Sequence, residues 1–263
     1  MKKEMITKKS KRGQITIFVI IAIVIVFIIA GFFLLSNKDS NMPSLKENPS
    51  GYIKANIEKC AKEAIDDAER IVIKNAGFLE QDNAWVFNGT SYQKLCDGSG
   101  KDNLCTNNHP ILIVETQNEI KDYITPKLNA CFETIKSSLR NYKYQADSNV
   151  INVSIVDREI RVEIKKDLAI EVNGQKINIE KFKVQVNSPL YQFLSITNRI
   201  INEELDCNCG MESCNANLMN LIKYNREFEI LKPIYGMNGE EVFTITELNS
   251  GKQFAFAIRN CVP

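Results

Sequence analysis

An uncharged apolar run of 21 residues, Ile15 to Leu35, constrains this chain more than any other feature. A helix of that length rises roughly 30 Å at about 1.5 Å per residue, which matches the hydrocarbon thickness of a bilayer. The apolar core of a signal peptide is shorter, about 7 to 15 residues, so we expect the run to be retained. The sequence therefore predicts one transmembrane helix over residues 15–35.

The charges around this run predict its orientation. Of the 33 basic and 32 acidic residues of the chain, six basic residues and one acidic residue lie in the tail 1–14 that precedes it. Because basic residues favour the cytoplasmic side, the N-terminus is expected inside and residues 36–263 outside. The predicted location is the cytoplasmic membrane, with the lipid bilayer as the partner of Ile15 to Leu35.

The outer part of the chain keeps the remaining 27 basic and 31 acidic residues and is therefore slightly acidic. Nucleic acid binding depends on a surplus of basic residues that neutralise phosphates, so no nucleic acid partner is expected. Every cysteine of the chain also lies in this part. An even number of cysteines in an oxidising compartment indicates disulfides rather than free thiols. The candidates are Cys60, Cys96, Cys105, Cys131, Cys207, Cys209, Cys214 and Cys261.

Composition divides the outer part into three segments. Residues 36–50, rich in Asn, Ser and Pro, are typical of a polar tether. Residues 51–145 are expected to form a helical pair with a hairpin and loop insert. Residues 146–263 are expected to form an antiparallel sheet with a covering helix and a cysteine cluster. The predicted fold class is α+β, with amphipathic helices packed on an antiparallel sheet and held by disulfides.

Two helices are predicted from apolar residues that recur every three or four positions. The first runs from Tyr52 to Ala76, with Ser50 as its cap and Gly77 as its stop, and the second from about Thr116 to Asn141. Pro126 is expected to kink or restart the second helix. Cys60 and Cys131 each lie on the apolar stripe of their own helix, so the sequence predicts a disulfide between them.

Between these helices, and after the second, the patterns predict strands and turns. Trp85-Val86-Phe87 before Asn88-Gly89 predicts a hairpin, followed by a loop bracketed by Cys96 and Cys105. From Ile151 to Val186 apolar residues alternate, with a phase slip at Glu180-Lys181 that indicates a bulge or break.

The C-terminal part begins with Ser188-Pro189, which predicts the start of a helix that covers the sheet and ends near Leu205. A short helical stretch is predicted near residues 218–224. Three strand-like runs follow, around residues 228–231, 242–246 and 254–258.

Few residues point to catalysis, and no catalytic residue and no cofactor are predicted. The single histidine, His109, is interpreted as a surface loop residue because no nucleophile signature accompanies it. Gly98-Ser99-Gly100-Lys101 lacks the glycine spacing of a phosphate loop. The carboxylates Asp66, Asp67, Glu69, Glu203 and Glu204 are expected on the solvated sides of helices.

The most specific local pattern is Cys207-x-Cys209-x4-Cys214. A zinc site would need Cys261 or His109 as the fourth ligand, and a redox-active C-x-C is a further alternative. Disulfides are favoured over both, with one of Cys207 and Cys209 reaching Cys261 and the other reaching Cys214. Asn88 and Asn152 lie in N-glycosylation sequons, Asn88-Gly89-Thr90 and Asn152-Val153-Ser154.

Lys11-Arg12-Gly13-Gln14-Ile15-Thr16 resembles the archaeal class III, prepilin-type signal sequence. The resemblance implies cleavage between Gly13 and Gln14. Pilins usually carry Glu at the fifth mature position, where this chain has Phe18. With the Ile57-Glu58-Lys59-Cys60 segment, the chain also resembles membrane-anchored proteins of small-genome archaea, a group that carries no assigned activity.

Three functions remain in competition. The leading hypothesis is a single-pass, surface-exposed module that acts by binding or assembly, with a protein partner or self-association and without catalysis. The second is a type IV pilin-like filament subunit processed after Gly13. The third is an ectoenzyme, which would need a pocket with convergent polar groups.

Overall fold

The computed structural model describes residues 48–97, 106–139, 143–146, 150–172, 175–205, 227–235 and 240–259. Within these ranges the chain is a mixed α+β protein with three helices and ten strands. None of these helices combines the length and the apolarity needed to cross a membrane. The run 15–35 lies outside the described residues.

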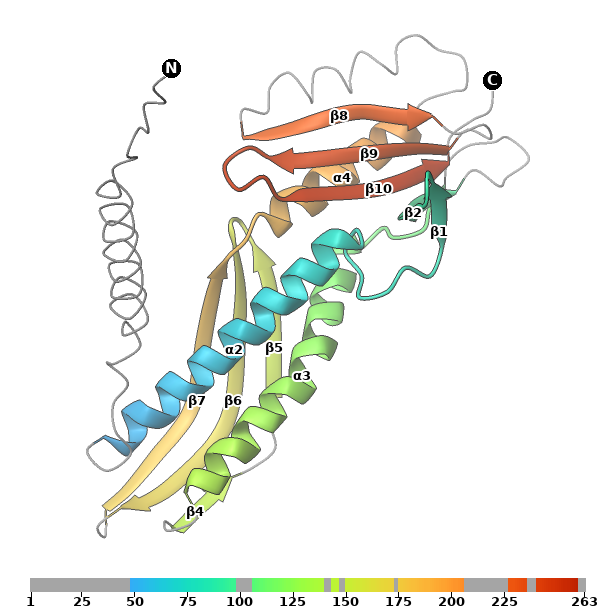
Figure 1. Cartoon of the computed structure of the whole chain (residues 1–263). Coiled ribbons are helices and arrows are strands. Elements are labelled where there is room, and N and C mark those ends of the chain that lie inside the picture. Colours follow the sequence, from blue (N-terminus) through green and yellow to red (C-terminus); the bar gives the residue numbers. More distant parts are fainter. Residues whose placement is uncertain are drawn as a thin grey trace, which may run out of the picture.

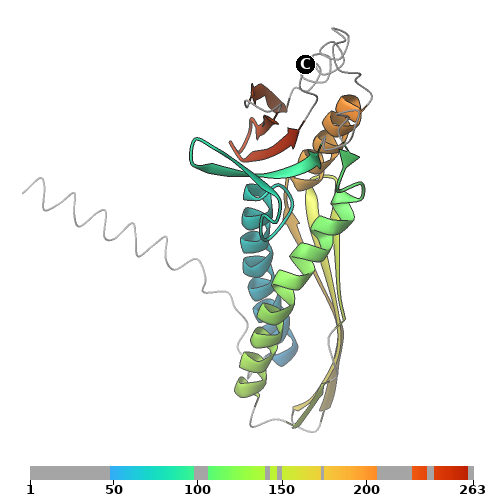
Figure 2. The ribbon, with the colours of Figure 1, turned by 90° about the vertical axis from the view of Figure 1, so that its right-hand side faces the viewer.

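The lower half of the molecule in Figure 1 is an elongated layer of two helices on a sheet, which we call the stalk. The helices run in opposite directions along one face of the sheet, and Figure 2 shows both on the same side of it. α2 packs over β7 and α3 over β5. The stalk elements are α2 (Pro49–Lys74), α3 (Leu112–Ser138), β4 (Lys143–Ala146), β5 (Val150–Val156), β6 (Glu159–Val172) and β7 (Gln175–Asn187).

Helix α2 forms where the apolar period predicts it, with a start that differs from the expectation. The predicted cap, Ser50, is wrong, because the N-cap is Asn48, whose Oδ1 accepts a hydrogen bond from the Gly51 amide at 2.8 Å. Pro49 then occupies the first turn, where its missing N–H costs nothing. The helix ends at Lys74, and Gly77 follows with a φ of +107°, which favours glycine.

Helix α3 is one continuous helix that contains Pro126. Pro126 therefore does not end and restart it, which was one of the two expected outcomes. The predicted disulfide between Cys60 and Cys131 is confirmed and joins the two helices, whose Cα atoms at these positions are 6.5 Å apart.

In the stalk sheet, β6 is the central strand. β7 pairs with it along its whole length, whereas β5 and β4 pair with its first and second halves and so share the other edge. The phase slip predicted at Glu180-Lys181 corresponds to an irregularity in this pairing. Lys165 pairs with Lys181 and Leu168 with Ile179, so two residues of β6 oppose Glu180 alone. The bulge is therefore in β6, the partner of the strand whose pattern indicated it.

The upper half, which we call the head, is a second sheet with a helix against one face (Figure 1). The strand order is β1-β2-β10-β9-β8, with β3 paired to β2. An antiparallel sheet was expected, but β2 and β10 are parallel. The head elements are α4 (Leu190–Leu205), β1 (Ala84–Phe87), β2 (Thr90–Asp97), β3 (Thr106–Asn107), β8 (Phe228–Tyr235), β9 (Glu240–Glu247) and β10 (Gln253–Arg259).

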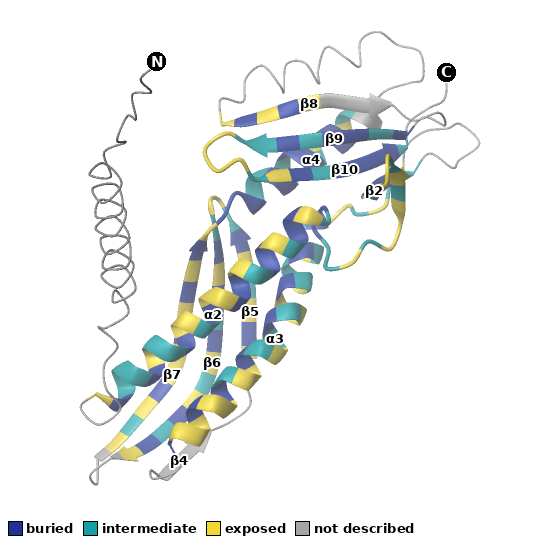
Figure 3. Ribbon diagram, viewed as in Figure 1, coloured by how far each residue is buried: buried dark blue, intermediate teal, exposed yellow. Residues whose placement is uncertain are grey.

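Helix α4 starts as predicted, because the Ser188 hydroxyl accepts a hydrogen bond from the Leu190 amide at 3.1 Å. Its Phe193 ring packs against those of Phe228 and Phe254, each at 5.5 Å, which fixes the helix to the sheet. Buried residues of head and stalk form one continuous hydrophobic core. Figure 3 shows that core as dark blue segments along the inner faces of both halves.

Candidate binding groove

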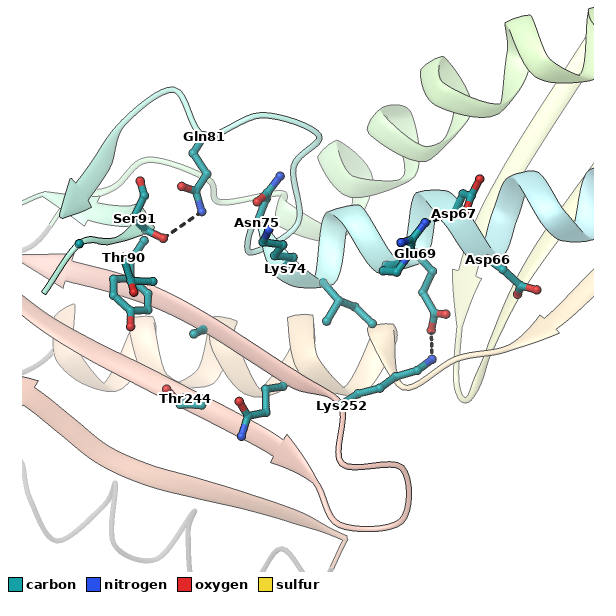
Figure 4. Close-up of a pocket in the computed structure, with 16 residues that line it drawn as sticks. Asp66, Asp67, Glu69, Lys74, Asn75, Gln81, Thr90, Ser91, Thr244 and Lys252 are labelled. Atoms are coloured by element: carbon teal, nitrogen blue, oxygen red, sulfur yellow. Dashed lines mark hydrogen bonds and ion pairs between the residues drawn. The ribbon is translucent and has the colours of Figure 1, made fainter. Parts of the chain in front are cut away.

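A groove of about 1100 Å³ lies where the stalk meets the head. Three segments from distant parts of the sequence form its walls and floor: the C-terminal half of α2, the β1–β2 hairpin, and the β9–β10 hairpin (Figure 4). The volume is slightly above the usual range for small-molecule sites, about 300–1000 Å³. The groove is therefore large enough for an extended ligand.

The β1–β2 wall is a hairpin with a two-residue turn, and the residues of the turn suit its backbone conformation. Asn88 and Gly89 have φ angles of +48° and +79°, the left-handed values that a tight Asn-Gly hairpin requires. The β9–β10 wall turns at Gly251, with a φ of +70°. Both walls are thus fixed by local sequence signals.

The floor of the groove is made by small side chains. Alternate residues of a strand face opposite sides of its sheet. Phe254 contacts Phe193 of α4, so Ala255 faces the other side, beside its cross-strand partner Thr244. Ala255 and Thr244 are both half-buried and line the groove. Their small size leaves the space that bulkier residues would fill.

An ion pair links the two sides of the groove. Lys252, in the β9–β10 hairpin, donates through Nζ to Oε1 of Glu69 on α2 at 2.8 Å (Figure 4). The Glu69 side chain is only 7% exposed. Its expected position on a solvated helix face is wrong, because the head covers this part of α2 and supplies a cation to the buried carboxylate.

A second charged cluster lies further along α2. Asp67 Oδ1 accepts from Arg70 at 2.8 Å, and its Oδ2 accepts from Nζ of Lys127 on α3 at 3.1 Å. The hydrogen bond from Lys127, followed by that from Arg70, lowers the pKa of Asp67 below its ordinary value. The hydrogen bond with the Tyr123 hydroxyl, followed by that with Asp67, raises the pKa of Lys127. Asp67 is half-exposed and Asp66 is exposed, in agreement with their expected solvation.

The charges that line the groove balance. Three are acidic and three are basic: Asp66, Asp67, Glu69, Arg70, Lys74 and Lys252. The other polar groups are amides and hydroxyls, which both donate and accept hydrogen bonds. They belong to Asn75, Gln81, Thr90, Ser91, Tyr92, Thr244 and Gln253.

Two of these amides are held in place by the backbone. Asn75 Nδ2 donates to the carbonyl of Leu79 at 2.8 Å. Gln81 Nε2 donates to the carbonyl of Ser91 at 3.3 Å (Figure 4). Each bond uses an amide nitrogen and so fixes the orientation of the side chain. The groove therefore presents hydrogen-bond donors and acceptors, and two of its amides are held in a fixed orientation, which suits ligand binding.

His109 has a structural role. Its Nδ1 is 2.8 Å from Oε2 of Glu115, and its ring packs 4.6 Å from that of Phe78. Its side chain is 21% exposed, so it is more enclosed than the surface loop residue that was expected. These contacts hold the loop before α3 against the end of α2, and they lie outside the groove lining.

Most of the predicted cysteine sites lie outside the described residues. Cys96 is disulfide-bonded in addition to Cys60 and Cys131. Five other cysteines lie outside the described residues: Cys105, Cys207, Cys209, Cys214 and Cys261. The favoured disulfide pairings and the zinc alternative therefore stay predictions. Among the described residues, no group of His, Cys, Asp or Glu is arranged to hold a metal ion.

Of the remaining predicted sites, some lie outside the described residues and some lie within them. Gly13, Gln14 and the segment 98–101 lie outside the described residues. Asn88, at the tip of the β1–β2 hairpin, and Asn152, on the open face of the stalk sheet, are both exposed. Glu203 is half-buried on α4.

The groove itself was missed from sequence, although one signal was present. Phe254-Ala255-Phe256-Ala257 alternates large and small residues, which indicates a strand packed on one face and open to close approach on the other. The partner walls could not be inferred, because they come from segments more than 150 residues earlier. Comparison of the chain with protein-family models, curated proteins and solved structures finds no match.

Proposed function

We propose that the chain is a single-pass membrane protein with its N-terminus inside, which displays the groove on the outer surface for ligand binding. The observation that carries the proposal is the position of the groove along α2. The helix starts at Pro49, at the end of the tether predicted over residues 36–50, and its C-terminal half forms one wall of the groove. With 26 residues at about 1.5 Å each, α2 spans about 39 Å.

The stalk therefore separates the tether from the groove. An anchor at residues 15–35 would hold the start of α2 near the bilayer, while the groove would lie at the distal end, accessible to ligands. The six basic residues before the apolar run support the orientation, and the disulfide between Cys60 and Cys131 agrees with an oxidising compartment.

Topology is the first test. Protease added to intact cells should remove the part of the chain beyond about Ser36 and leave the N-terminal tail protected. Full protection of the outer part would overturn the proposal.

Groove binding is the second test. Vesicles that carry the full chain should bind to isolated cell envelopes, and Ala255→Phe, which fills the floor, should abolish that binding. Val150→Phe is the matched control, because Val150 is 54% exposed on the stalk, away from the groove. Equal binding by the three chains would contradict the proposed role of the groove.

A filament subunit is the second candidate, favoured by Lys11-Arg12-Gly13-Gln14 before the apolar run. Mass spectrometry of the N-terminal peptide of the native protein distinguishes it. A mature start at Gln14 would favour assembly into filaments, whereas retention of the basic tail favours the anchored binding protein.

A further inference from the structure

Three aromatic side chains extend the hairpin wall of the groove. Trp85 is directly opposite Tyr92, and Phe87 is directly opposite Thr90, across the β1–β2 pair. Residues directly opposite each other share one face of a sheet. Tyr92 and Thr90 line the groove, so Trp85 and Phe87 share the hairpin face of these two residues and lie next to the lining without belonging to it. Ser91, from the opposite face of the hairpin, also contributes to the lining. We call Trp85, Phe87 and Tyr92 the aromatic strip.

The aromatic strip is ordered and partly open. The rings of Trp85 and Phe87 stack with centroids 5.2 Å apart and an interplanar angle of 29°. All three side chains are half-buried, so each retains surface for a ligand. Aromatic rings of this kind provide a flat apolar surface, and Tyr and Trp add a polar atom at the edge.

The groove beside the aromatic strip provides the complementary polar groups. The amides of Asn75, Gln81 and Gln253 carry both donors and acceptors, as do the hydroxyls of Thr90 and Thr244. A sugar ring has the same two properties, because its C–H face is apolar and its hydroxyls both donate and accept. The juxtaposition of flat rings and amides therefore fits a carbohydrate.

Charge argues against one other ligand class, and sheet pairing limits where a second could bind. The lining contains three acidic and three basic residues, so a strongly charged polymer gains no net attraction. An extended peptide usually adds a strand to a free sheet edge. β9 offers no such edge, because it pairs with both β10 and β8. β10 pairs with β2 only at residues 257–258, so its floor residues 253–256 keep one free edge, and a peptide strand is the competing ligand class that the test has to separate.

We propose that the ligand of the groove is a neutral oligosaccharide of several sugar units, a proposal that rests on the groove being a binding site. One or two sugar rings stack on the aromatic strip, and the following units run along the floor over Ala255 and Thr244. The amides of Gln253 and Asn75 bond to hydroxyls from the two sides.

The test uses the full chain in phosphatidylcholine nanodiscs, titrated separately with chitohexaose, cellohexaose, maltohexaose and mannohexaose. Trp85 is the single tryptophan of the chain, so its fluorescence reports directly on the aromatic strip. At least one hexasaccharide should change the emission in a saturable manner, and the corresponding monosaccharide should bind more weakly by tenfold or more.

Variants locate that binding. Tyr92→Ala should weaken it about tenfold, whereas Tyr92→Phe, which keeps the ring, should restore most of it. Gln253→Ala should weaken it several-fold. Gln185→Ala is the matched control, an exposed strand glutamine on β7 of the stalk, and should leave binding unchanged.

Two outcomes distinguish a wrong ligand class from a groove that is not a binding site. If no hexasaccharide binds but polylysine, polyglutamate or a serine–valine decapeptide does, with the same sensitivity to Tyr92→Ala, the ligand class is wrong and the groove remains a binding site. If envelope binding is also insensitive to Ala255→Phe, both proposals fail. Saccharide binding that Tyr92→Ala leaves unchanged would overturn the aromatic strip as the contact.

Discussion

The stalk and the head bury their cores with different side chains. In the stalk, the helices present mainly Ile and Ala to an Ile- and Val-rich sheet, for example Ile57, Ala61 and Ile164. In the head, the Phe193 ring of α4 stacks on Phe254 of β10 and meets Phe228 of β8 edge-to-face. Four phenylalanines of the head are fully buried: Phe193, Phe243, Phe254 and Phe256. The aliphatic faces of the stalk helices cover a long, thin sheet, whereas the phenylalanine rings of the head fill a compact core.

The two regions also differ in how their chain segments are connected. In the stalk sheet, β5, β6 and β7 pair as antiparallel neighbours in chain order, and β4 also pairs with β6 in the antiparallel sense. The head joins residues 94–96 of β2 to residues 257–258 of β10 in parallel. The groove lies at the boundary, because α2 belongs to the stalk and both hairpins belong to the head. Binding at such a site depends on how firmly the two regions hold each other.

The largest effect is expected in the head, from Phe193→Ala. Phe193 is fully buried, and its ring contacts two strands, so its removal should cost about 3–5 kcal/mol of unfolding free energy. Chemical denaturation measures the loss. Hydrogen exchange should increase first at amides of β8 to β10, while the helices of the stalk keep their protection. Uniform loss of protection in both regions would show that they unfold as one unit.

The disulfide of the stalk supports the next prediction. The bridge between Cys60 and Cys131 spans 71 positions of sequence, and its loss through Cys60→Ser should cost about 2–4 kcal/mol. For a chain of this size that lowers the melting temperature by roughly 5 to 15 °C.

The double variant is the control for this disulfide. Cys60→Ser with Cys131→Ser should cost little more than the single change, because the bridge is already absent. An unchanged melting temperature in the single variant, or no new alkylation of Cys131, would contradict this role. Binding in the groove should survive at temperatures where the variant is folded.

These regions were unequally predictable from sequence. In the stalk, period and alternation identified α2, α3, β5, β6 and β7, and the inward positions of Cys60 and Cys131 predicted their disulfide. Such patterns are local, and each residue reports which face it buries. The parallel pairing of β2 with β10 is not encoded in any local window. The groove depends on that pairing, so its residues could not be brought together from sequence.

Glu69 shows the same limit at a single residue. The helical period places Glu69 away from the most apolar stripe of α2, and a solvated carboxylate was the natural interpretation. Glu69 is covered by the β9–β10 hairpin, in which Lys252, 183 positions later in the chain, supplies the counter-charge. Ile65 and Ile73, four residues on either side of Glu69, are buried with it, but no residue within α2 indicates the counter-charge that Lys252 supplies.

The Glu69–Lys252 ion pair allows a direct test of the contact between stalk and head. Glu69→Gln should cost about 1–2 kcal/mol, between the values for exposed and fully buried pairs, because Lys252 remains 37% exposed and can be hydrated. A double-mutant cycle with Lys252→Met should give a coupling energy of about 1 kcal/mol. A coupling near zero would mean that the two regions are held together by the shared hydrophobic core alone.

The smallest effect concerns Asp67, which lies within the stalk and is half-exposed. Its folded-state pKa is lowered below the ordinary value of 3.8, first by the hydrogen bond from Lys127 and then by that from Arg70. The ionised carboxylate therefore stabilises the fold at pH values above 3.8, and this contribution is lost as the pH falls through the lowered pKa. Urea unfolding between pH 5 and pH 2 should show wild type more stable than Asp67→Asn at pH 5, with the difference shrinking below pH 3.8. Carbon-detected NMR titration of the Asp67 carboxyl gives the same information directly, and Lys127→Met should move its pKa back toward 3.8. A stability difference that stays constant down to pH 2, or an Asp67 titration that Lys127→Met leaves unchanged, would show that this ion pair between α2 and α3 does not stabilise the stalk.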